Sequence, residues 1–433
     1  MSHAVRRLRG MAPKANAGRR YRLYPDAVSA ERLAAWGHTS RWVWNIALEQ
    51  RNLVWATWHT TMRAQDQCRY LTSARNELAW LEDLPAQSAQ EVLRRLDRAF
   101  ANWLNPKHSA RRPTYKKRGR SLSVAFPGQA VAVRKVNRRW AEVRIPKLGW
   151  IRFRLSRPLG GVVRNATITC SALGWHVSFG VATEAAPAEP NGRSGMGVDF
   201  GIACSAYCSD ETSPRLLPAT LTPGERRRLL GLERQQACQR TWAKRHNRGV
   251  ASKRLRRTTQ EIARLRGRQA RRRADFTHKL TTDLAKNHGF VGIEDLRVKD
   301  MTRSARGTHA APGVNVAAKR GLNREICDNA WGERRRQLTY KCLAFGSELV
   351  VVPAAGTSQT CAACGRRDAA NRVGCGRLFA CVYCGHVDQA DRNAAKNIER
   401  IAAGQAVNST RSRRLAARPS RSRMREPLMG STA

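Results

Sequence analysis

The chain has 433 residues, more than a single hydrophobic core usually holds, so two or three domains are expected. It carries 80 Lys and Arg against 32 Asp and Glu, a formal net charge of +48. Such a chain repels itself unless a polyanion neutralises it, and a nucleic acid is the expected partner. No stretch approaches the roughly 20 apolar residues of a membrane-spanning helix, and the basic N-terminus lacks the apolar run of a signal peptide. We therefore expect a cytoplasmic, nucleoid-associated protein with no membrane partner.

Residues 1–20 are rich in arginine and are predicted to form a basic arm. From about 29 to 104, apolar residues recur every three or four positions, which indicates helices with one packed face. Five of the tryptophans in this region could either stack on bases or fill a core: Trp36, Trp42, Trp44, Trp55 and Trp58. Large aromatic side chains are usually buried, so core packing is the favoured prediction.

The segment "NPKHSARRPTYKKRGRSLSVAFPG" combines turn residues with a dense run of positive charge. Lys116 and Lys117, beside Tyr115, are candidate phosphate contacts, although such runs are more often solvated surface. From about 121 to 181, short stretches such as "WIRFRL" alternate apolar and polar residues, which predicts a small antiparallel sheet or barrel. The Pro/Ala/Glu-rich linker that follows places a domain boundary near residue 190.

An arginine-rich segment from about 225 to 273 is predicted to form one or two long helices with positive charge on several faces. Because a helix that is basic all round has little reason to bury, the segment is either a solvated arm or a strut along a nucleic-acid duplex. The net charge favours the strut. A further helix carries Phe276, Leu280 and Leu284 on one stripe and ends at Gly289.

The last part of the chain alternates strands and helices. After the strand "FVGIEDL" we expect a mobile loop over 301–322, a helix over 323–345 and a strand over 349–352. A helix over about 391–404 then precedes an Arg/Ser/Pro-rich tail, residues 405–433, which is predicted to be disordered.

Three acids stand where an acid is unusual: Asp199 interrupts an apolar strand, Glu294 ends another, and Asp391 begins a helix. A strand–helix–strand alternation can bring such positions to one edge of a sheet. Three crowded carboxylates repel one another unless a cation holds them, and oxygen ligands favour Mg²⁺ or Mn²⁺. Two such ions can activate a water and stabilise the leaving oxygen of a phosphodiester. Each of these acids, taken alone, could cap a helix or form a salt bridge with a basic residue. The prediction therefore depends on all three acids together.

Four of the twelve cysteines form two C-x-x-C pairs separated by sixteen residues, a spacing typical of a structural zinc site: Cys361, Cys364, Cys381 and Cys384. Cys375, between the pairs, is expected to be a bystander, and the scattered remainder to be reduced thiols. A zinc ribbon over 357–386 lies immediately before Asp391. We expect it to fix the position of that carboxylate.

The stretches that hold these acids and cysteines resemble the motifs of TnpB (OrfB) proteins. Insertion sequences encode these proteins, which have long been called accessory transposases and are relatives of miniature type V CRISPR nucleases. "GVDFG", "VGIEDL" and "SQTCAACG…CVYCGHVDQADRNAAKNI" resemble the three RuvC motifs and the zinc ribbon of that family. "GLNREICDNAWGERRRQLTYK" looks like its helix before the ribbon, "YRLYPD…RWVWNIALEQRN" is similar to its N-terminal helical region, and "RRPTYKKRGRSLSVAFPG" to the junction after it. The resemblance omits only the first twenty residues and the tail.

The resemblance implies an α/β plus β fold. An RNase-H-like RuvC nuclease domain with an inserted zinc ribbon is expected over 196–404, preceded over 21–189 by a wedge β-barrel that carries a helical recognition lobe. The implied activity is RNA-guided cleavage of double-stranded DNA beside a short flanking motif, with guide RNA and target DNA as partners. Asp199, Glu294 and Asp391 are then expected to bind the catalytic Mg²⁺ (or Mn²⁺), and the four paired cysteines Zn²⁺. Four residues are expected to lie near nucleic acid: Tyr21, Arg22, Lys116 and Lys117.

Two other functions remain open. The chain could be a transposase that cuts and joins DNA ends itself, although no clear DNA-recognition helix is evident. It could also be a non-catalytic zinc-ribbon protein that binds nucleic acid, in which the acids are structural. The arginine-rich insert, residues 240–273, is longer and more basic than the resemblance leads us to expect.

Overall fold

The computed structural model describes residues 15–118, 122–183, 188–374 and 376–416. The chain divides into two compact units: unit 1 holds residues 1–186 and 232–267, and unit 2 holds residues 187–231 and 268–433. Within the described ranges, no helix is both long enough and apolar enough to cross a bilayer.

Unit 1 is built on a seven-stranded sheet with antiparallel pairing throughout, in the order β2-β6-β7-β1-β5-β4-β3. Alternating side chains place one face of each strand in a core where the rings of Tyr21, Phe153 and Phe179 meet at centroid distances of 5.3 to 6.0 Å. The strands are β1 (Ala15–Tyr24), β2 (Leu122–Pro127), β3 (Ala132–Lys135), β4 (Trp140–Ile145), β5 (Gly149–Arg154), β6 (Val162–Ser171) and β7 (Gly174–Thr183).

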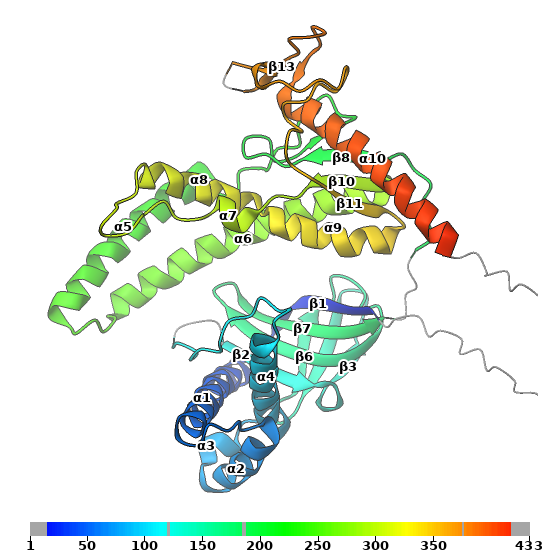
Figure 1. Cartoon of the computed structure of the whole chain (residues 1–433). Coiled ribbons are helices and arrows are strands. Elements are labelled where there is room, and N and C mark those ends of the chain that lie inside the picture. The colour runs from blue at the N-terminus through cyan, green and yellow to red at the C-terminus, as the bar shows by residue number, and fades with distance from the viewer. Residues whose placement is uncertain (1–14, 119–121, 184–187, 375, 417–433) are drawn as a thin grey trace, which may run out of the picture. The chain divides into compact units, whose positions relative to one another are not determined.

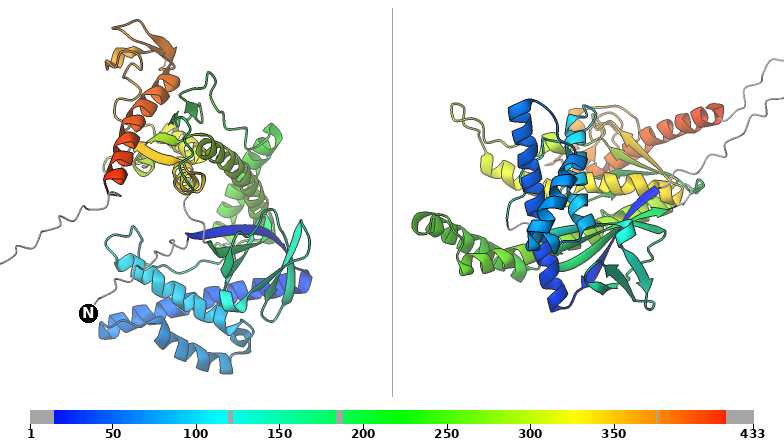
Figure 2. Two further views of the ribbon diagram at one scale, coloured as in Figure 1. Left: turned by 90° about the vertical axis from the view of Figure 1, so that its right-hand side faces the viewer. Right: turned by 90° about the horizontal axis from the view of Figure 1, so that it is seen from below.

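Four helices lie between β1 and β2: α1 (Ala27–Trp58), α2 (Ala64–Glu77), α3 (Ala79–Glu82) and α4 (Ala86–Leu104). Helices α1, α2 and α4 lie side by side (Figure 2). Helix α1 begins where the Asp26 carboxylate accepts a hydrogen bond of 2.7 Å from the Ser29 backbone N–H, an N-cap. Its buried stripe includes Leu33, Trp36 and Leu48.

The prediction that the five tryptophans fill a core is wrong for three of them. Trp36 is buried and Trp44 is half-buried, whereas Trp42, Trp55 and Trp58 are 52–66% exposed. A 32-residue helix can place only one stripe against the sheet and its neighbours, so residues on its other faces reach solvent whatever their hydrophobicity.

The arginine-rich segment forms two antiparallel helices, α5 (Pro223–His246) and α6 (Lys253–Asn287) (Figure 1). Three side-chain contacts join the two helices: Glu225–Arg272 (2.5 Å), Glu233–Arg266 (2.7 Å) and Gln236–Thr259 (2.8 Å). The residue numbers of the contacts increase along α5 and decrease along α6, as expected for antiparallel helices. The prediction that such a helix has little reason to bury is wrong. A stripe at helical spacing among the arginines is buried: Leu255, Thr258, Ile262 and Leu265.

Unit 2 contains a four-stranded sheet in the order β11-β10-β8-β9, in which β11, β10 and β8 are parallel and β9 is antiparallel. The strands are β8 (Met196–Asp199), β9 (Tyr207–Cys208), β10 (Phe290–Glu294) and β11 (Glu348–Val352). The helices of unit 2 that follow α6 are α7 (Val298–Met301), α8 (Val316–Asn329), α9 (Trp331–Phe345) and α10 (Ala390–Ala416). Helix α10 packs along the sheet against β8, β10 and β11 (Figure 1).

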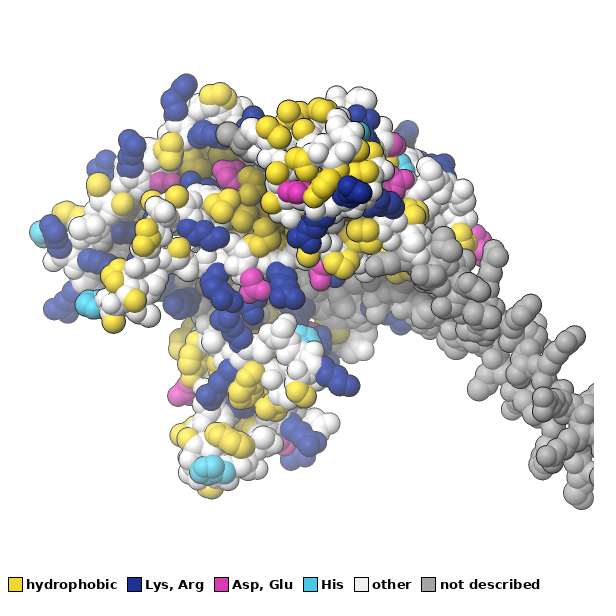
Figure 3. Space-filling model, turned by 45° about the horizontal axis from the view of Figure 1, so that its top comes forward, with side chains coloured by type: hydrophobic (Ala, Val, Ile, Leu, Met, Phe, Trp, Pro, Cys, Tyr) yellow, Lys and Arg dark blue, Asp and Glu magenta, His cyan; other side chains and the backbone are white. Residues whose placement is uncertain are grey.

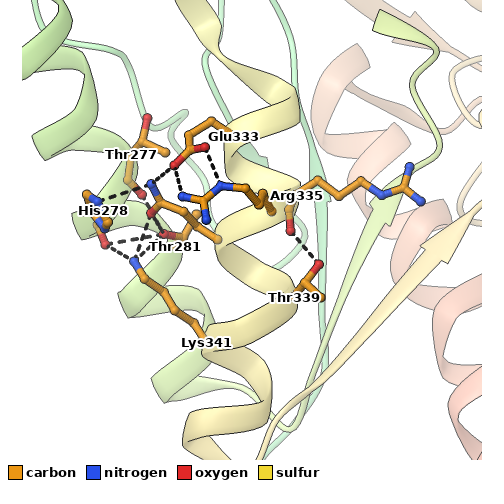
Figure 4. Close-up of polar contacts among 9 residues, drawn as sticks. Thr277, His278, Thr281, Glu333, Arg335, Thr339 and Lys341 are labelled. Atoms are coloured by element: carbon orange, nitrogen blue, oxygen red, sulfur yellow. Dashed lines mark hydrogen bonds and ion pairs between the residues drawn. The ribbon is translucent and has the colours of Figure 1, made fainter. Parts of the chain in front are cut away.

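A buried polar network joins α9 to the C-terminal part of α6 (Figure 4). The Lys341 ammonium donates to the carbonyl of His278 (2.8 Å) and to the hydroxyls of Thr281 (2.7 Å) and Thr282 (2.9 Å). Burial lowers the pKa of Lys341 to about 8. Because these donors and acceptors have fixed directions, the network sets how α9 lies on α6.

Three sequence predictions of element boundaries differ from the structure. Strand β1 begins at Ala15, inside the predicted basic arm, because it pairs with β7 from that residue. The single helix predicted before the ribbon is two helices, α8 and α9, which break at Ala330 (φ 53°). Helix α10 continues to Ala416, past its predicted end at 404 and into the segment predicted to be disordered.

Candidate active site and metal centre

Asp199 and Glu294 are the last residues of adjacent parallel strands. The register pairs Gly292 with Gly197 and Ile293 with Val198, so Glu294 of β10 stands beside Asp199 of β8. The carboxyl ends of parallel strands share one edge of a sheet, where binding sites of α/β proteins gather. The strand alternation therefore brings two acids that are distant in sequence to one edge.

Two glycines allow α10 to approach this sheet closely. Gly197 and Gly292 are paired across β8 and β10. A Cβ at Gly197 would lie 2.1 Å from the carbonyl oxygen of Ala395, and one at Gly292 would lie 2.7 Å from the Cβ of Ala402. Helix α10 thus packs backbone against backbone, and its first turn, which carries Asp391, is held at the same edge as Asp199.

The ribbon is tied to the start of α10 by buried asparagines. Asn393 accepts a hydrogen bond from the Ala362 N–H (2.9 Å) and donates to the Thr360 carbonyl (2.8 Å). Asn397, one turn later, donates to the carbonyls of Thr357 (3.0 Å) and Thr360 (2.6 Å). The expected mechanical link between ribbon and final acid therefore runs through these two side chains, which sequence reasoning missed.

The three acids interact electrostatically. Burial, then the charges of Glu294 and Asp391, raises the pKa of Asp199 to about 8, and Arg372 of the ribbon partly offsets this. Burial also raises the pKa of Glu294, against a hydrogen bond that its carboxylate accepts from the Thr357 hydroxyl. The arrangement disfavours three negative charges together, and a bound cation is the group that would relieve it.

The four paired cysteines are more tightly gathered than the acids. Their sulfurs all lie within 4.8 Å of one another, and in the described ranges no other set of three or more His, Cys, Asp or Glu ligand atoms is that compact. Sulfur–sulfur distances are 3.7 Å for Cys361–Cys384 and 3.6 Å for Cys364–Cys381. Four sulfurs at about 2.3 Å from a tetrahedral Zn²⁺ stand about 3.8 Å apart, so these distances fit zinc and are too long for disulfides.

Both halves of the cysteine site have the same backbone turn. Cys361 N–H donates to the carbonyl of Arg366, and Cys381 N–H to that of His386, each over 2.9 Å. Gly365 (φ 76°) and Gly385 (φ 69°) follow the second cysteine of each pair, in the left-handed region that favours glycine. The three strands β12 (Arg372–Val373), β13 (Leu378–Ala380) and β14 (Val387–Gln389) complete the ribbon. The predicted bystander Cys375 lies outside the described residues.

A buried arginine holds the loop after Asp199. Arg334 of α9 is fully buried, packs over the ring of Phe200 at 5.1 Å, and donates to the Ser205 carbonyl (2.5 Å) and hydroxyl. Asn329 donates to the carbonyl of Ile202 (3.4 Å) in the same loop. Burial lowers the pKa of Arg334 to about 10. The sequence did not single out Arg334, because nothing in the segment "GERRRQ" distinguishes it from the neighbouring arginines.

The structure separates the four predicted nucleic-acid contacts. Tyr21 is 2% exposed and its hydroxyl donates to the Arg157 carbonyl (3.1 Å), so the prediction of a surface contact is wrong: β1 is central in its sheet, and Tyr21 faces the core. Arg22, the next residue, faces the other way and is half-buried. Lys116 and Lys117 are exposed, with the Lys116 ammonium 3.9 Å from the ring centroid of Trp44.

Positive charge is distributed widely. Lys and Arg side chains are spread over the face drawn in Figure 3, and fewer acidic side chains lie among them. The net charge of +48 favours binding of a polyanion.

Three family models match the chain. The one described as a probable transposase (OrfB of IS605) matches residues 178–305, a helix-turn-helix domain model matches 11–57, and a Cas12f1-like TNB domain model matches 331–398. InsQ of Escherichia coli (strain K12), named as a candidate RNA-guided DNA endonuclease, is 36% identical over 90% of this chain and 92% of its own length. The chain belongs to the TnpB/OrfB family.

Further relatives are consistent with membership in the TnpB/OrfB family. A Streptomyces pristinaespiralis protein, also named as a candidate RNA-guided DNA endonuclease, is 30% identical over 96% of each chain. Among solved structures, a Cas12f1–sgRNA–target DNA complex aligns over 86% of this chain and 83% of its own, at 13% identity and a TM-score of 0.43. The two curated relatives confirm, at the level of the family, the resemblance read from the sequence motifs.

Proposed function

We propose that this TnpB-family chain is an RNA-guided DNA endonuclease of a transposable element. Its RuvC-like centre at Asp199, Glu294 and Asp391 hydrolyses a phosphodiester of the target DNA beside a short flanking motif, with the help of a divalent cation. The family relationship supports the guide and the DNA substrate, and the names of the two relatives point the same way. The placement of three acids at one sheet edge, in an otherwise basic chain, is the observation that carries the chemistry.

Each acid has a defined support. Thr357 orients Glu294 by a hydrogen bond from its hydroxyl. Asp391 lies in the first turn of α10, and Asn393 ties this turn to the ribbon. Asp199 is followed by the loop that Arg334 and Asn329 hold. These supports keep three carboxylates directed at one edge despite their mutual repulsion.

The donor set fits Mg²⁺ or Mn²⁺, because carboxylate oxygens are the ligands that these ions prefer. When bound, such an ion supplies Lewis-acid stabilisation of the phosphodiester and an activated water. The three carboxylates would hold the ion, and the residues that contact them would fix their orientation. The cysteine sulfurs fit structural Zn²⁺, with all four positions taken by thiolates and none open for chemistry.

In the proposed architecture, unit 1 supplies the wedge sheet and the helical lobe, and unit 2 the nuclease centre. The all-antiparallel sheet of unit 1, with helices inserted between its first two strands, supports this assignment. The parallel β11-β10-β8 core of unit 2, with α10 across it, supports an RNase-H-like nuclease.

The test uses the full chain purified with the RNA that accompanies it. We expect plasmid DNA that matches this RNA to be cut in the presence of Mg²⁺, and mismatched plasmid to stay intact. Ribonuclease treatment before the assay should abolish cutting. Cutting that survives ribonuclease would instead indicate a transposase acting directly on DNA, and nucleic-acid binding without any cutting would indicate a non-catalytic protein.

A further inference from the structure

The turn that enters the ribbon contacts one of the three acids as well as α10. Thr357 lies shortly before Cys361, the first cysteine of the ribbon, and its side chain is buried. Its hydroxyl donates to the Glu294 carboxylate at the end of β10, and its carbonyl accepts a hydrogen bond of 3.0 Å from Asn397 of α10. A single residue thus joins β10, α10 and the start of the ribbon.

The hydroxyl of Thr357 has two acceptors and one proton. Besides Glu294, the carbonyl oxygen of Ala354 lies 3.1 Å from the hydroxyl oxygen. An ionised carboxylate accepts a stronger hydrogen bond than a neutral carbonyl, so a charged Glu294 takes the proton. This bond uses Oε1 of Glu294 and leaves Oε2 as the oxygen for an ion. The hydroxyl therefore fixes the direction of this carboxylate in the form that binds a cation.

A short hydrogen-bonded turn fixes Thr357 relative to the first cysteine pair. The carbonyl of Gly356 accepts hydrogen bonds of 3.0 Å from the backbone N–H groups of Gln359 and Thr360. Gly356 has φ 91°, in the left-handed region that favours glycine. Cys361 follows this turn directly, so a displacement of its sulfur also displaces the Thr357 hydroxyl.

Asn371, which is fully buried, joins the same turn to the second cysteine pair. Its amide donates to the Gln359 carbonyl (2.9 Å), and its side-chain oxygen accepts a hydrogen bond of 3.0 Å from the N–H of Val382. Val382 lies between Cys381 and Cys384. An ion held by all four sulfurs draws both cysteine pairs to one point and orders the turn between them. The contacts form a continuous path from the four sulfurs to the acid at the end of β10.

We propose that Thr357 is a positioning residue that couples the cysteine site to the acid site: zinc on the sulfurs strengthens the binding of a divalent cation at the acids, through the hydroxyl that orients Glu294. The inference rests on the proposed function for the identity of the acid site. Coupling between two binding sites is reciprocal, so a cation at the acids also strengthens the binding of zinc. A ribbon that acted on the site through α10 alone would make the Thr357 hydroxyl dispensable.

The experiment measures Mn²⁺ binding to the full chain with its co-purified RNA, by electron paramagnetic resonance of free Mn²⁺, before and after a chelator withdraws the zinc. Asp199→Ala, measured in parallel, reports the Mn²⁺ held by the RNA, and the difference is the binding at the acids. Withdrawal of zinc should weaken this binding about fivefold or more in the parent. Thr357→Val with its zinc in place should show a similar weakening, and withdrawal of zinc should then change little. Thr357→Ser, which keeps the hydroxyl, should behave like the parent.

The reciprocal measurement is the rate at which zinc passes to a chromogenic chelator. Mn²⁺ should slow this transfer in the parent and leave it unchanged in Thr357→Val. Thr258→Val is the matched control, because Thr258 is also buried and its hydroxyl donates to the Arg254 carbonyl (3.1 Å) in α6. This control should keep the coupling of the parent in both measurements.

Two results overturn the inference and leave the proposed nuclease standing. One is an equal Mn²⁺ affinity of the parent with and without zinc, and the other is a Thr357→Val protein whose Mn²⁺ affinity still depends on zinc as in the parent. Equal Mn²⁺ binding by the parent and Asp199→Ala overturns both proposals, because the acids then hold no ion.

Discussion

The seven-stranded sheet of unit 1 and the four-stranded sheet of unit 2 place their polar residues in different ways. In unit 2 the acids stand where strands end, so each occupies a recognisable interruption of an apolar run. In unit 1 the arginines and aromatic residues alternate along the strands, and they form a set only because the register aligns them across β1, β5, β4 and β3. A site at strand ends can be located from local sequence, whereas a site on a sheet face depends on pairing between strands.

The largest effect should come from the acids of unit 2. Asp199→Ala should lower guided DNA cleavage at least about 10³-fold, because a ligand of the catalytic ion is lost. Binding of the co-purified RNA should not change, since the variant removes one carboxylate and no basic side chain. Measuring the rate of plasmid cleavage and the RNA affinity on the same preparation checks both parts of this prediction. Parallel loss of RNA affinity would show that the variant disturbs more than the metal site.

Loss of the metal site in the ribbon should reduce cleavage nearly as strongly. Cys361→Ser removes one of four thiolates, so zinc content should fall well below one equivalent and cleavage should fall about tenfold to 100-fold. The reason is mechanical: without the ion, the turn that Asn393 and Asn397 hold against α10 loses its order. Elemental analysis and cleavage rates provide the readout. Cys327→Ser, at an exposed cysteine of α8, should alter neither.

The close packing of α10 can be tested at a glycine. Gly197→Ala places a methyl group against the Ala395 backbone, and we expect the free energy of unfolding to fall by about 2–3 kcal/mol. Gly231→Ala in α5 is the matched control, since nothing lies within 4 Å of its added Cβ. That change should stabilise the protein by about 0.5–1 kcal/mol, because glycine weakens a helix interior. Equal effects at the two positions would contradict the packing argument.

A further test concerns stability against pH in the absence of divalent metal. The pKa of Asp199 rises from its ordinary value of 3.8 to about 8, so the folded state keeps a proton that the unfolded state releases. This contribution to stability is therefore complete below about pH 4, declines as the pH rises, and is lost above about pH 8. Chemical denaturation across this range should show the decline, and Asp199→Asn should flatten it. An unchanged decline in the variant would assign the effect to other groups.

The sequence predicted some features well for identifiable reasons. The family resemblance followed from short motifs, and relatives of similar length confirm it. The four cysteines were predicted to bind zinc from spacing alone, and their sulfurs come together in a compact set. Tyr21 and the exposed tryptophans of α1 were predicted wrongly, because the side on which a residue lies depends on the packing of the whole element. The helix break at Ala330 had no signal in the sequence.

The sequence by itself predicted the kinds of chemistry in this protein: a positive charge suited to a polyanion, three acids at unusual positions and four cysteines spaced for a metal ion. These follow from charge and from spacing within short segments, which the chain carries into any fold. Only the tertiary structure decided that Gly197 and Gly292 form one platform for α10, that Asn393 and Asn397 join ribbon to helix, and that Arg334 holds the loop after Asp199. The reason is that each of these relationships joins residues from separate segments, and strand register and helix packing fix such distances through the folded chain as a whole.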